Sequence, residues 1–299
     1  MVPFLLFCKS YAGDLKRVKR LWLSVQRFNV DRIPFYISVP AADRALFEQT
    51  IGQHPGLFWV SDEDIVRANP MADPGQYRLW DGRLSQQVVK SEFWRHAGCE
   101  NYLCLDSESE FIRDFRQSDF LDPQGVPYTV MHQSKELLQL AANKGIDKVL
   151  DDFHRDSAMM KSVFGRSGPD YDFGPTPVIW SARVWQDLDE HYLRPKGMTL
   201  WDAIRERPSE LRWYGESLLH FRSIPLLPVE PLFRVYHYNW QWLAQRRLRE
   251  SASTLRSVYL GVLCQSSWQY EWDSGTQAKR KSWPSRMVRA AKAWLARFR

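Results

Sequence analysis

The chain of 299 residues lacks the segments that mark several common protein classes. No run approaches the roughly 18 apolar residues of a membrane-spanning helix. The apolar run at residues 2–8 has no charged segment before it and is too short for a secretory signal. No glycine-rich dinucleotide fingerprint or P-loop follows that run. The sequence therefore argues against an integral membrane, secreted or P-loop protein.

Cysteine is scarce as well, with four residues in the chain. Cys8 and Cys104 lie inside apolar runs that read as strands, and no two cysteines have the spacing of metal ligands. We therefore expect reduced core cysteines in a cytoplasmic protein.

Acidic residues are missing from the C-terminal stretch, residues 279–299, which holds eight Lys and Arg. Without this stretch the chain has 33 bases and 35 acids, so its body is nearly neutral although the net charge is +6. A near-neutral body argues against nucleic-acid binding by the whole domain.

The same stretch predicts a basic amphipathic helix over residues 284–299. At 100° per residue one face is apolar and the other basic. The apolar face carries Met287, Ala291, Trp294, Leu295 and Phe298, and the rest carries Arg286, Arg289, Lys292 and Arg297. Such a helix is typical of membrane-surface binding. A solvated helix packed on the domain, or a partner-binding helix, is the alternative.

The N-terminal part alternates strand and helix patterns. Residues 2–8, 33–39 and 57–60 read as strands, with helices after Asp14 and over 41–51. Asp14 is placed to cap the first of these helices. This alternation predicts a parallel α/β sheet with right-handed crossovers.

The most informative stretch is Tyr102–Ile112, where a buried-strand pattern stops at alternating acids. Asp106 and Glu108 are two residues apart, so in an extended chain both side chains point the same way. Carboxylates at the carboxyl end of a parallel strand are placed for a ligand, and together they suit Mg²⁺ or Mn²⁺. A solvated turn with capping acids is the alternative.

The helix expected before that strand, starting at Asp81-Gly82, has a polar face made of Gln86, Gln87 and Lys90. Beside a carboxylate turn these side chains could hold a ribose or a phosphate. A solvated helix face explains the spacing equally well.

These motifs together resemble a known group. Gln86-Gln87-x-x-Lys90 followed by Leu105-Asp106-Ser107-Glu108 resembles glycosyltransferases of the GT-A fold, and more narrowly the bacterial DUF6492 family. Ser209–Gly215 matches that family's S-E-Y-E-L-Y-G element at Ser, Glu, Tyr and Gly. Thr176–Trp180 and Gly261–Ser266 are also similar, so the resemblance spans about residues 3–270. Glu108 departs from the usual Asp, and Arg212 stands where a second Glu is common.

The resemblance implies a GT-A-like, Rossmann-type sheet, mostly parallel and flanked by helices. It implies one catalytic domain over 1–270, with a nucleotide-sugar half at 1–131 and an acceptor half at 132–270, followed by the basic tail at 279–299.

It further implies metal-dependent transfer of a sugar, of the hexosyltransferase type, from a nucleotide-diphosphate donor to a glycan or glycolipid. Because the basic tail at 284–299 predicts membrane-surface binding, the expected acceptor is lipid-linked. The expected setting is bacterial cell-envelope polysaccharide or lipopolysaccharide assembly, in the cytoplasm at the inner face of the cytoplasmic membrane. The alternative is a non-catalytic nucleotide-sugar-binding or membrane-associated scaffold protein.

Roles for individual residues follow from the same resemblance. Mn²⁺ or Mg²⁺ is expected on Asp106, Glu108 and His237, with His220 as the second choice of histidine. The donor is expected to contact Lys9, Tyr11, Asp14, Gln86, Gln87, Lys90, Asp106 and Ser107. Glu210 is the expected catalytic base with Glu216 as its alternative. Trp180, Trp213 and Tyr214 are expected to line the acceptor site, although tryptophans are more often core residues.

Overall fold

The computed structural model describes residues 2–77, 81–274 and 283–295. The chain divides into two compact units that are each built from separate segments. Unit 1 comprises Met1–Ser10, Asp31–Asp106 and Arg116–Pro231, and unit 2 comprises Tyr11–Val30, Ser107–Phe115 and Leu232–Arg299.

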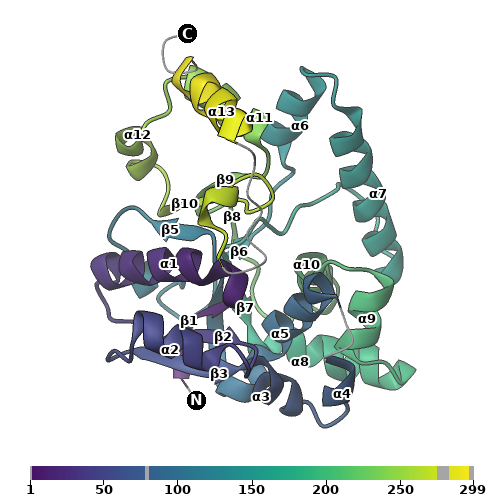
Figure 1. Cartoon of the computed structure of the whole chain (residues 1–299). Coiled ribbons are helices and arrows are strands. Elements are labelled where there is room, and N and C mark those ends of the chain that lie inside the picture. The colour runs from purple at the N-terminus through teal and green to yellow at the C-terminus, as the bar shows by residue number, and fades with distance from the viewer. Residues whose placement is uncertain (1, 78–80, 275–282, 296–299) are drawn as a thin grey trace. The chain divides into compact units, whose positions relative to one another are not determined.

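Unit 1 is organised around a five-stranded sheet in the order β3-β2-β1-β4-β7. The strands are β1 (Val2–Lys9), β2 (Phe35–Val39), β3 (Leu57–Ser61), β4 (Cys99–Asp106) and β7 (Val178–Ser181). The first four are parallel, and β7 runs antiparallel to β4. The predicted α/β fold with a mostly parallel sheet is confirmed (Figure 1).

The two central strands are apolar because helices cover the sheet around them. The side chains of Leu5–Cys8 in β1 and Tyr102–Leu105 in β4 are fully buried. Helix α5 (Gly82–Ala97) packs on β1 and β4, and α8 (Ala182–Leu188) packs on β4 and β7. Continuous apolar runs are therefore stable here, where an alternating pattern would bury polar groups.

The remaining helices of unit 1 are α2 (Arg44–Ile51), α3 (Asp62–Arg67), α4 (Pro74–Tyr77), α6 (Lys135–Ala142), α7 (Asp147–Phe164), α9 (Leu200–Glu206) and α10 (Glu210–Phe221). The sequence of residues 134–163 predicts helix, and the structure has two helices there, α6 and α7. Gly145 lies between them with φ of 65°, a conformation that ends a helix. The sequence also predicts a strand over residues 126–131, of which only β6 (Thr129–Val130) pairs, with β8 (Pro228–Val229).

Unit 2 has a three-stranded sheet in the order β5-β10-β9, on which α1 (Leu15–Phe28) packs through β5. Its strands are β5 (Ser109–Phe111), β9 (Phe233–Tyr236) and β10 (Gly261–Cys264). The sequence of residues 241–256 predicts one basic helix, but the structure has two there, α11 (Asn239–Arg247) and α12 (Ala252–Arg256), with Arg249 between them at φ of 60°.

The C-terminal helix is α13 (Trp283–Leu295). Of the predicted tail, residues 279–282 and 296–299, including Arg297 and Phe298, lie outside the described residues. Among the helices that are described, none is long and apolar enough to cross a membrane.

The expected halves at 1–131 and 132–270 do not coincide with the two units. Strand β7 comes from the second expected half but completes the sheet of the first, through its pairing with β4. None of the four cysteines forms a disulfide. Cys8, Cys99 and Cys104 are buried, as expected of core residues, whereas Cys264 is only half-buried.

Gly215 in α10 provides a test of packing in unit 1. A Cβ at this position would come within 2.0 Å of Phe173 Cγ. We expect Gly215→Ala to lower the free energy of unfolding by about 1–3 kcal/mol, because overpacking outweighs the gain in helix propensity of about 1 kcal/mol. Urea denaturation measures the change.

Gly82→Ala is the matched control, because Gly82 begins α5 and nothing lies within 4 Å of an added Cβ. An unfolding midpoint of Gly215→Ala as high as that of Gly82→Ala would contradict the packing described for Phe173.

Candidate functional site

The carboxyl edge of the sheet in unit 1 brings together polar side chains from four elements. Lys9 at the end of β1 lies level with Asp106 at the end of β4. Because β7 is antiparallel to β4, its first residues lie at this same edge, and Thr176 just before β7 reaches Asp106. This edge is where parallel α/β sheets bind ligands.

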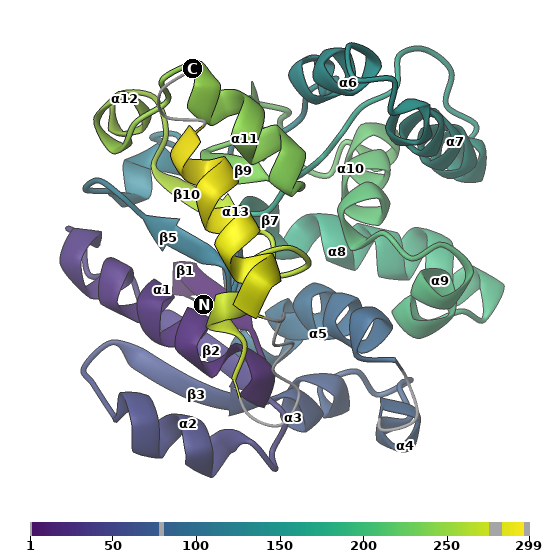
Figure 2. The same cartoon turned by 45° about the horizontal axis from the view of Figure 1, so that its top comes forward.

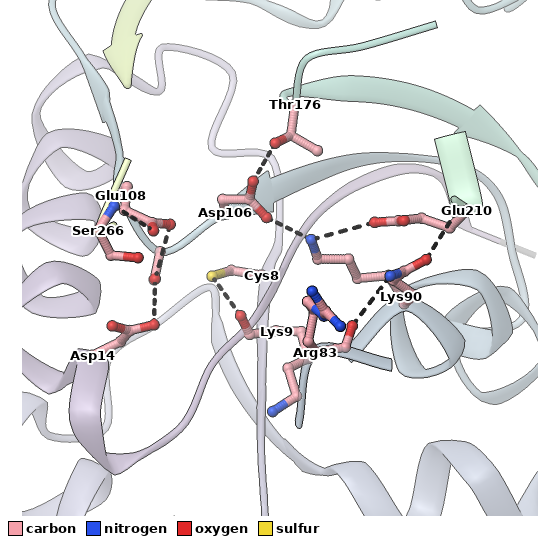
Figure 3. Close-up of polar contacts among 12 residues, drawn as sticks. Cys8, Lys9, Asp14, Arg83, Lys90, Asp106, Glu108, Thr176, Glu210 and Ser266 are labelled. Carbon is pink, nitrogen blue, oxygen red and sulfur yellow. Dashed lines mark hydrogen bonds and ion pairs between the residues drawn. The ribbon is translucent and has the colours of Figure 1, made fainter. Parts of the chain in front are cut away.

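Lys90 is the centre of the cluster, which we call the edge cluster: Lys90, Asp106, Thr176 and Glu210. The Lys90 Nζ atom lies 2.5 Å from Asp106 Oδ1 and 3.7 Å from Glu210 Oε1. Asp106 Oδ2 accepts a hydrogen bond from the Thr176 hydroxyl. Figure 3 shows these side chains converging from α5, β4, the β7 approach and α10.

Backbone and amide contacts fix the positions of the charged groups. The Tyr102 hydroxyl donates to the Lys90 carbonyl at 2.8 Å and so ties α5 to β4. The Glu210 backbone N–H donates to Gln87 Oε1 at 3.2 Å, which ties α10 to α5. Ser209 caps α10 by accepting from the Arg212 backbone N–H at 3.4 Å, so Glu210 is the first residue of that helix.

Burial and charge act in opposite directions on this cluster. Burial of Lys90 disfavours its charged form, but Asp106 and Glu210 outweigh that effect and hold the pKa of Lys90 well above its usual value. Burial raises the pKa of Glu210 above its usual value, although Lys90 opposes the shift. Lys90 is therefore a fixed cation, and Glu210 is a carboxylate that takes up a proton more readily than an exposed one. Asp106 keeps 24% of its side chain exposed.

Unit 2 contains a second group of predicted donor residues around Ser107. The Ser107 hydroxyl donates to Asp14 Oδ2 at 2.9 Å and lies 3.3 Å from Glu108 Oε2. The Ser266 backbone N–H donates to Glu108 Oε1 at 3.1 Å. Figure 3 shows Asp14, Glu108 and Ser266 near one another.

The prediction that the Asp14 side chain caps α1 is wrong. The Asp14 carboxylate instead pairs with the Arg17 guanidinium at 2.7 Å. Burial raises the pKa of Asp14, and Arg17 opposes the shift. Tyr11 is 42% exposed, and burial of its hydroxyl together with the charge of Asp14 raises its pKa.

The three predicted metal ligands do not form one site within either unit. Asp106 belongs to unit 1, whereas Glu108 and His237 belong to unit 2. Across the part of the chain that the structure describes, no group of three or more His, Cys, Asp or Glu is arranged to hold a metal ion. The oxygen ligands suit Mg²⁺ or Mn²⁺ in kind, but within a unit they are too few.

Two other predicted site residues, Lys9 and Glu216, form ion pairs with residues that do not belong to the edge cluster. Lys9 Nζ is 3.1 Å from Asp62 and also donates to the Ser10 carbonyl at 2.8 Å. Glu216 is buried and forms a two-point pair with Arg166, at 2.5 and 2.7 Å. Gln86 is half-buried on α5.

The three aromatic residues expected at the acceptor site are core residues. Trp180 and Tyr214 pack against each other with ring centroids 5.8 Å apart, and Trp213 is fully buried. The Tyr214 hydroxyl accepts from the Ser181 backbone N–H, and the Trp213 indole donates to the Arg207 carbonyl. Since protein covers their ring faces, they present no stacking surface to an acceptor.

Several contributors to these clusters were not assigned roles from the sequence. Thr176, Ser266 and Arg166 contact predicted site residues over long separations in the chain, and Arg17 contacts Asp14 three residues before it. Thr176 and Ser266 stand in the two sequence elements that resembled the DUF6492 family, and that was the only signal for them. Arg17 and Arg166 had none, because one arginine on a helix or in a loop looks like any other.

Two solved structures are similar to this chain, both at low identity. One, an apo structure of the bifunctional glycosyltransferase WbbM, has a TM-score of 0.46 at 11% identity. The match covers 87% of this chain and 45% of that one, so this chain spans less than half of its length. The other is the galactosyltransferase LgtC in complex with donor and acceptor sugar analogs. It has a TM-score of 0.44 at 12% identity and covers 97% of this chain and 94% of that one.

No curated protein sequence matches this chain. The family model described as "Family of unknown function (DUF6492)" matches residues 1–256. That match includes the Gln-Gln-x-x-Lys helix, the Asp-x-Glu turn and the element that begins at Ser209. The expected family is confirmed, and the chain belongs to DUF6492.

Proposed function

We propose that this protein is a glycosyltransferase that moves a sugar from a nucleotide-diphosphate donor to a hydroxyl group of an acceptor. The observation that carries the proposal is the edge cluster, in which Lys90 holds Asp106 and Glu210 at the carboxyl edge of a parallel sheet. The order of motifs along the chain, as in the DUF6492 family, supports the same conclusion.

In the proposed reaction an acceptor oxygen forms a bond to the anomeric carbon as the bond to the donor phosphate breaks. The acceptor hydroxyl must lose its proton, and Glu210 accepts it as general base. Lys90 keeps this carboxylate in place and favours its charged form. Asp106, the most exposed acid of the cluster, accepts hydrogen bonds from hydroxyl groups of the donor.

The leaving diphosphate gathers negative charge, and stabilising that charge is the usual electrostatic task of such a site. The expected Mn²⁺ or Mg²⁺ would supply this stabilisation as a bound cation. The described residues do not by themselves complete its ligand set, so the steps above are assigned to side chains alone.

The acceptor and setting are finer parts of the proposal. A glycan or lipid-linked acceptor in cell-envelope polysaccharide or lipopolysaccharide assembly is proposed from the basic C-terminal helix, and transfer of a hexose from the family resemblance. A panel of UDP-, GDP-, CMP- and dTDP-linked sugars, screened by thermal shift with and without Mn²⁺, identifies the donor, because a ligand that binds the native state raises the midpoint.

Glu210→Gln tests the proposed base. Donor turnover in the presence of an acceptor extract should fall about 100-fold or more, since a positioned base contributes at least that much. Glu206→Gln is the matched control, because Glu206 is exposed on α9 and pairs with Arg207. Turnover by Glu210→Gln equal to that of the control would remove Glu210 from the mechanism.

Lys90→Met tests the electrostatic role of the lysine through the pH profile. The base works only when deprotonated, so activity falls on the acid side of the pKa of Glu210. Removing Lys90 takes away the largest effect that opposes the burial raising this pKa, so the acid limb of the profile should move to higher pH. An acid limb that stays in place, or moves to lower pH, would show that Lys90 does not act on the base.

Glu216→Gln separates the two candidate bases. Glu216 neutralises Arg166, and removing one partner of a buried ion pair typically costs about 3 kcal/mol of stability. We expect a lower unfolding midpoint for Glu216→Gln, with turnover per folded molecule close to the wild-type value at low temperature. A stable but inactive Glu216→Gln variant would instead favour Glu216 as the base.

A further inference from the structure

The C-terminal part of unit 2 combines exposed bulky apolar side chains with an excess of positive charge. In α13 the exposed fractions are 71% for Trp283, 52% for Met287, 55% for Val288 and 51% for Leu295. Large apolar side chains that stay this exposed on a helix indicate a surface that something covers.

These four side chains lie on one side of α13. At 3.6 residues per turn their positions fall within an arc of about 140° around the helix axis. The arc is continuous along the helix from Trp283 to Leu295, so it forms one apolar face. That geometry suits a helix lying flat on an apolar boundary.

The neighbouring helix extends the same chemistry. Helix α13 packs against α11, and both lie side by side in Figures 1 and 2. Leu248, directly after α11, is 75% exposed, the highest value among the exposed large apolar residues of the described chain. Arg247 beside it is also exposed.

This region carries an excess of positive charge. Residues 239–299 hold twelve Lys and Arg and three acids, Glu250, Glu271 and Asp273. Glu250 pairs with Arg234 at 2.8 Å, and Asp273 pairs with Arg17. Because Arg234 and Arg17 lie outside residues 239–299, these two acids do not neutralise the basic residues of the region. The region therefore has an excess of positive charge that complements an anionic surface.

We propose that the face formed by Trp283, Met287, Val288 and Leu295, together with Arg247 and Leu248 at the end of the neighbouring helix α11, docks on an anionic lipid bilayer. The apolar side chains enter the boundary between headgroups and acyl chains, and the basic residues contact the headgroups. A site for duplex nucleic acid consists mainly of basic side chains that contact the phosphates, and four bulky apolar side chains would be out of place on it. The inference is independent of the proposed enzymatic activity.

The test is sedimentation of the full chain with vesicles at physiological salt. Vesicles that contain about one third phosphatidylglycerol should bind the protein, and pure phosphatidylcholine vesicles should bind it at least tenfold more weakly. Met287→Asp and Trp283→Ala should each weaken binding to the anionic vesicles about tenfold, because each removes an inserted apolar side chain. Arg247→Gln should weaken it about fivefold and only at low or physiological salt.

Leu46→Asp is the matched control, since Leu46 is an exposed leucine on a helix of unit 1. It should bind vesicles like the wild type. Unchanged thermal midpoints of the variants separate loss of binding from loss of folding, as expected for exposed positions. Three outcomes overturn the proposal: equal binding to both vesicle types, undiminished binding of Met287→Asp, or duplex DNA competing fully with vesicles for the wild-type chain.

Discussion

The ion pair between Lys90 and Asp106 is the contact on which the arrangement of unit 1 depends. A buried ammonium group is stable only when opposite charges and hydrogen bonds replace its water. Lys90 obtains them from Asp106 at the end of β4 and from Glu210 at the start of α10, while Thr176 before β7 completes the hydrogen bonding of Asp106. Helix α5, strand β4 and helix α10 therefore meet at the Lys90 nitrogen, and the segment before β7 joins them through Asp106.

The two acids of the Asp-x-Glu turn have different surroundings although they are two residues apart. Asp106 faces a cation, whereas Glu108 accepts hydrogen bonds from the Ser266 backbone N–H and lies beside the Ser107 hydroxyl. Each acid belongs to its own unit. The extra methylene group of Glu108 relative to Asp gives its carboxylate the reach for a backbone donor from the distant β10 end.

Hydrophobic periodicity and helix caps in the sequence predicted individual strands and helices correctly. The apolar runs of β1 and β4, the helix from Gly82 and the start of α10 at Glu210 all follow from periodicity and caps, and the structure has them there. The motif order also placed Gln87, Lys90, Asp106 and Glu210 in one site, and the structure brings these four together.

What the sequence could not predict were partners across long separations. Nothing local tells that Arg166 neutralises Glu216, or that Arg17 pairs with Asp273. Burial of Trp180, Trp213 and Tyr214 was equally hidden, because an indole in the core and an indole on a sugar-binding wall have the same sequence pattern. The breaks near Gly145 and Arg249 depend on a positive φ that periodicity does not report.

Helix geometry explains why the two acids of α10 are not interchangeable. Glu210 and Glu216 are six residues apart, so they point about 120° away from each other around the axis. Glu210 meets Lys90, which is shared with Asp106, and Glu216 meets Arg166 in a one-to-one pair. The first arrangement leaves the edge cluster with two carboxylates for one cation, and the second leaves no excess charge.

This imbalance also decides what the edge cluster can bind. Two carboxylates and one ammonium group carry a net negative charge, which favours hydroxyl groups and protons and repels a diphosphate. Burial raises the pKa of Glu210, and the negative charge of Asp106 raises it further. Protonation of Glu210 would remove the excess negative charge of the cluster. Sugar hydroxyls are therefore the natural ligands of Asp106 and Glu210, and the diphosphate of a donor needs positive charge from another source. That requirement is the physical reason to keep a divalent cation in the proposal.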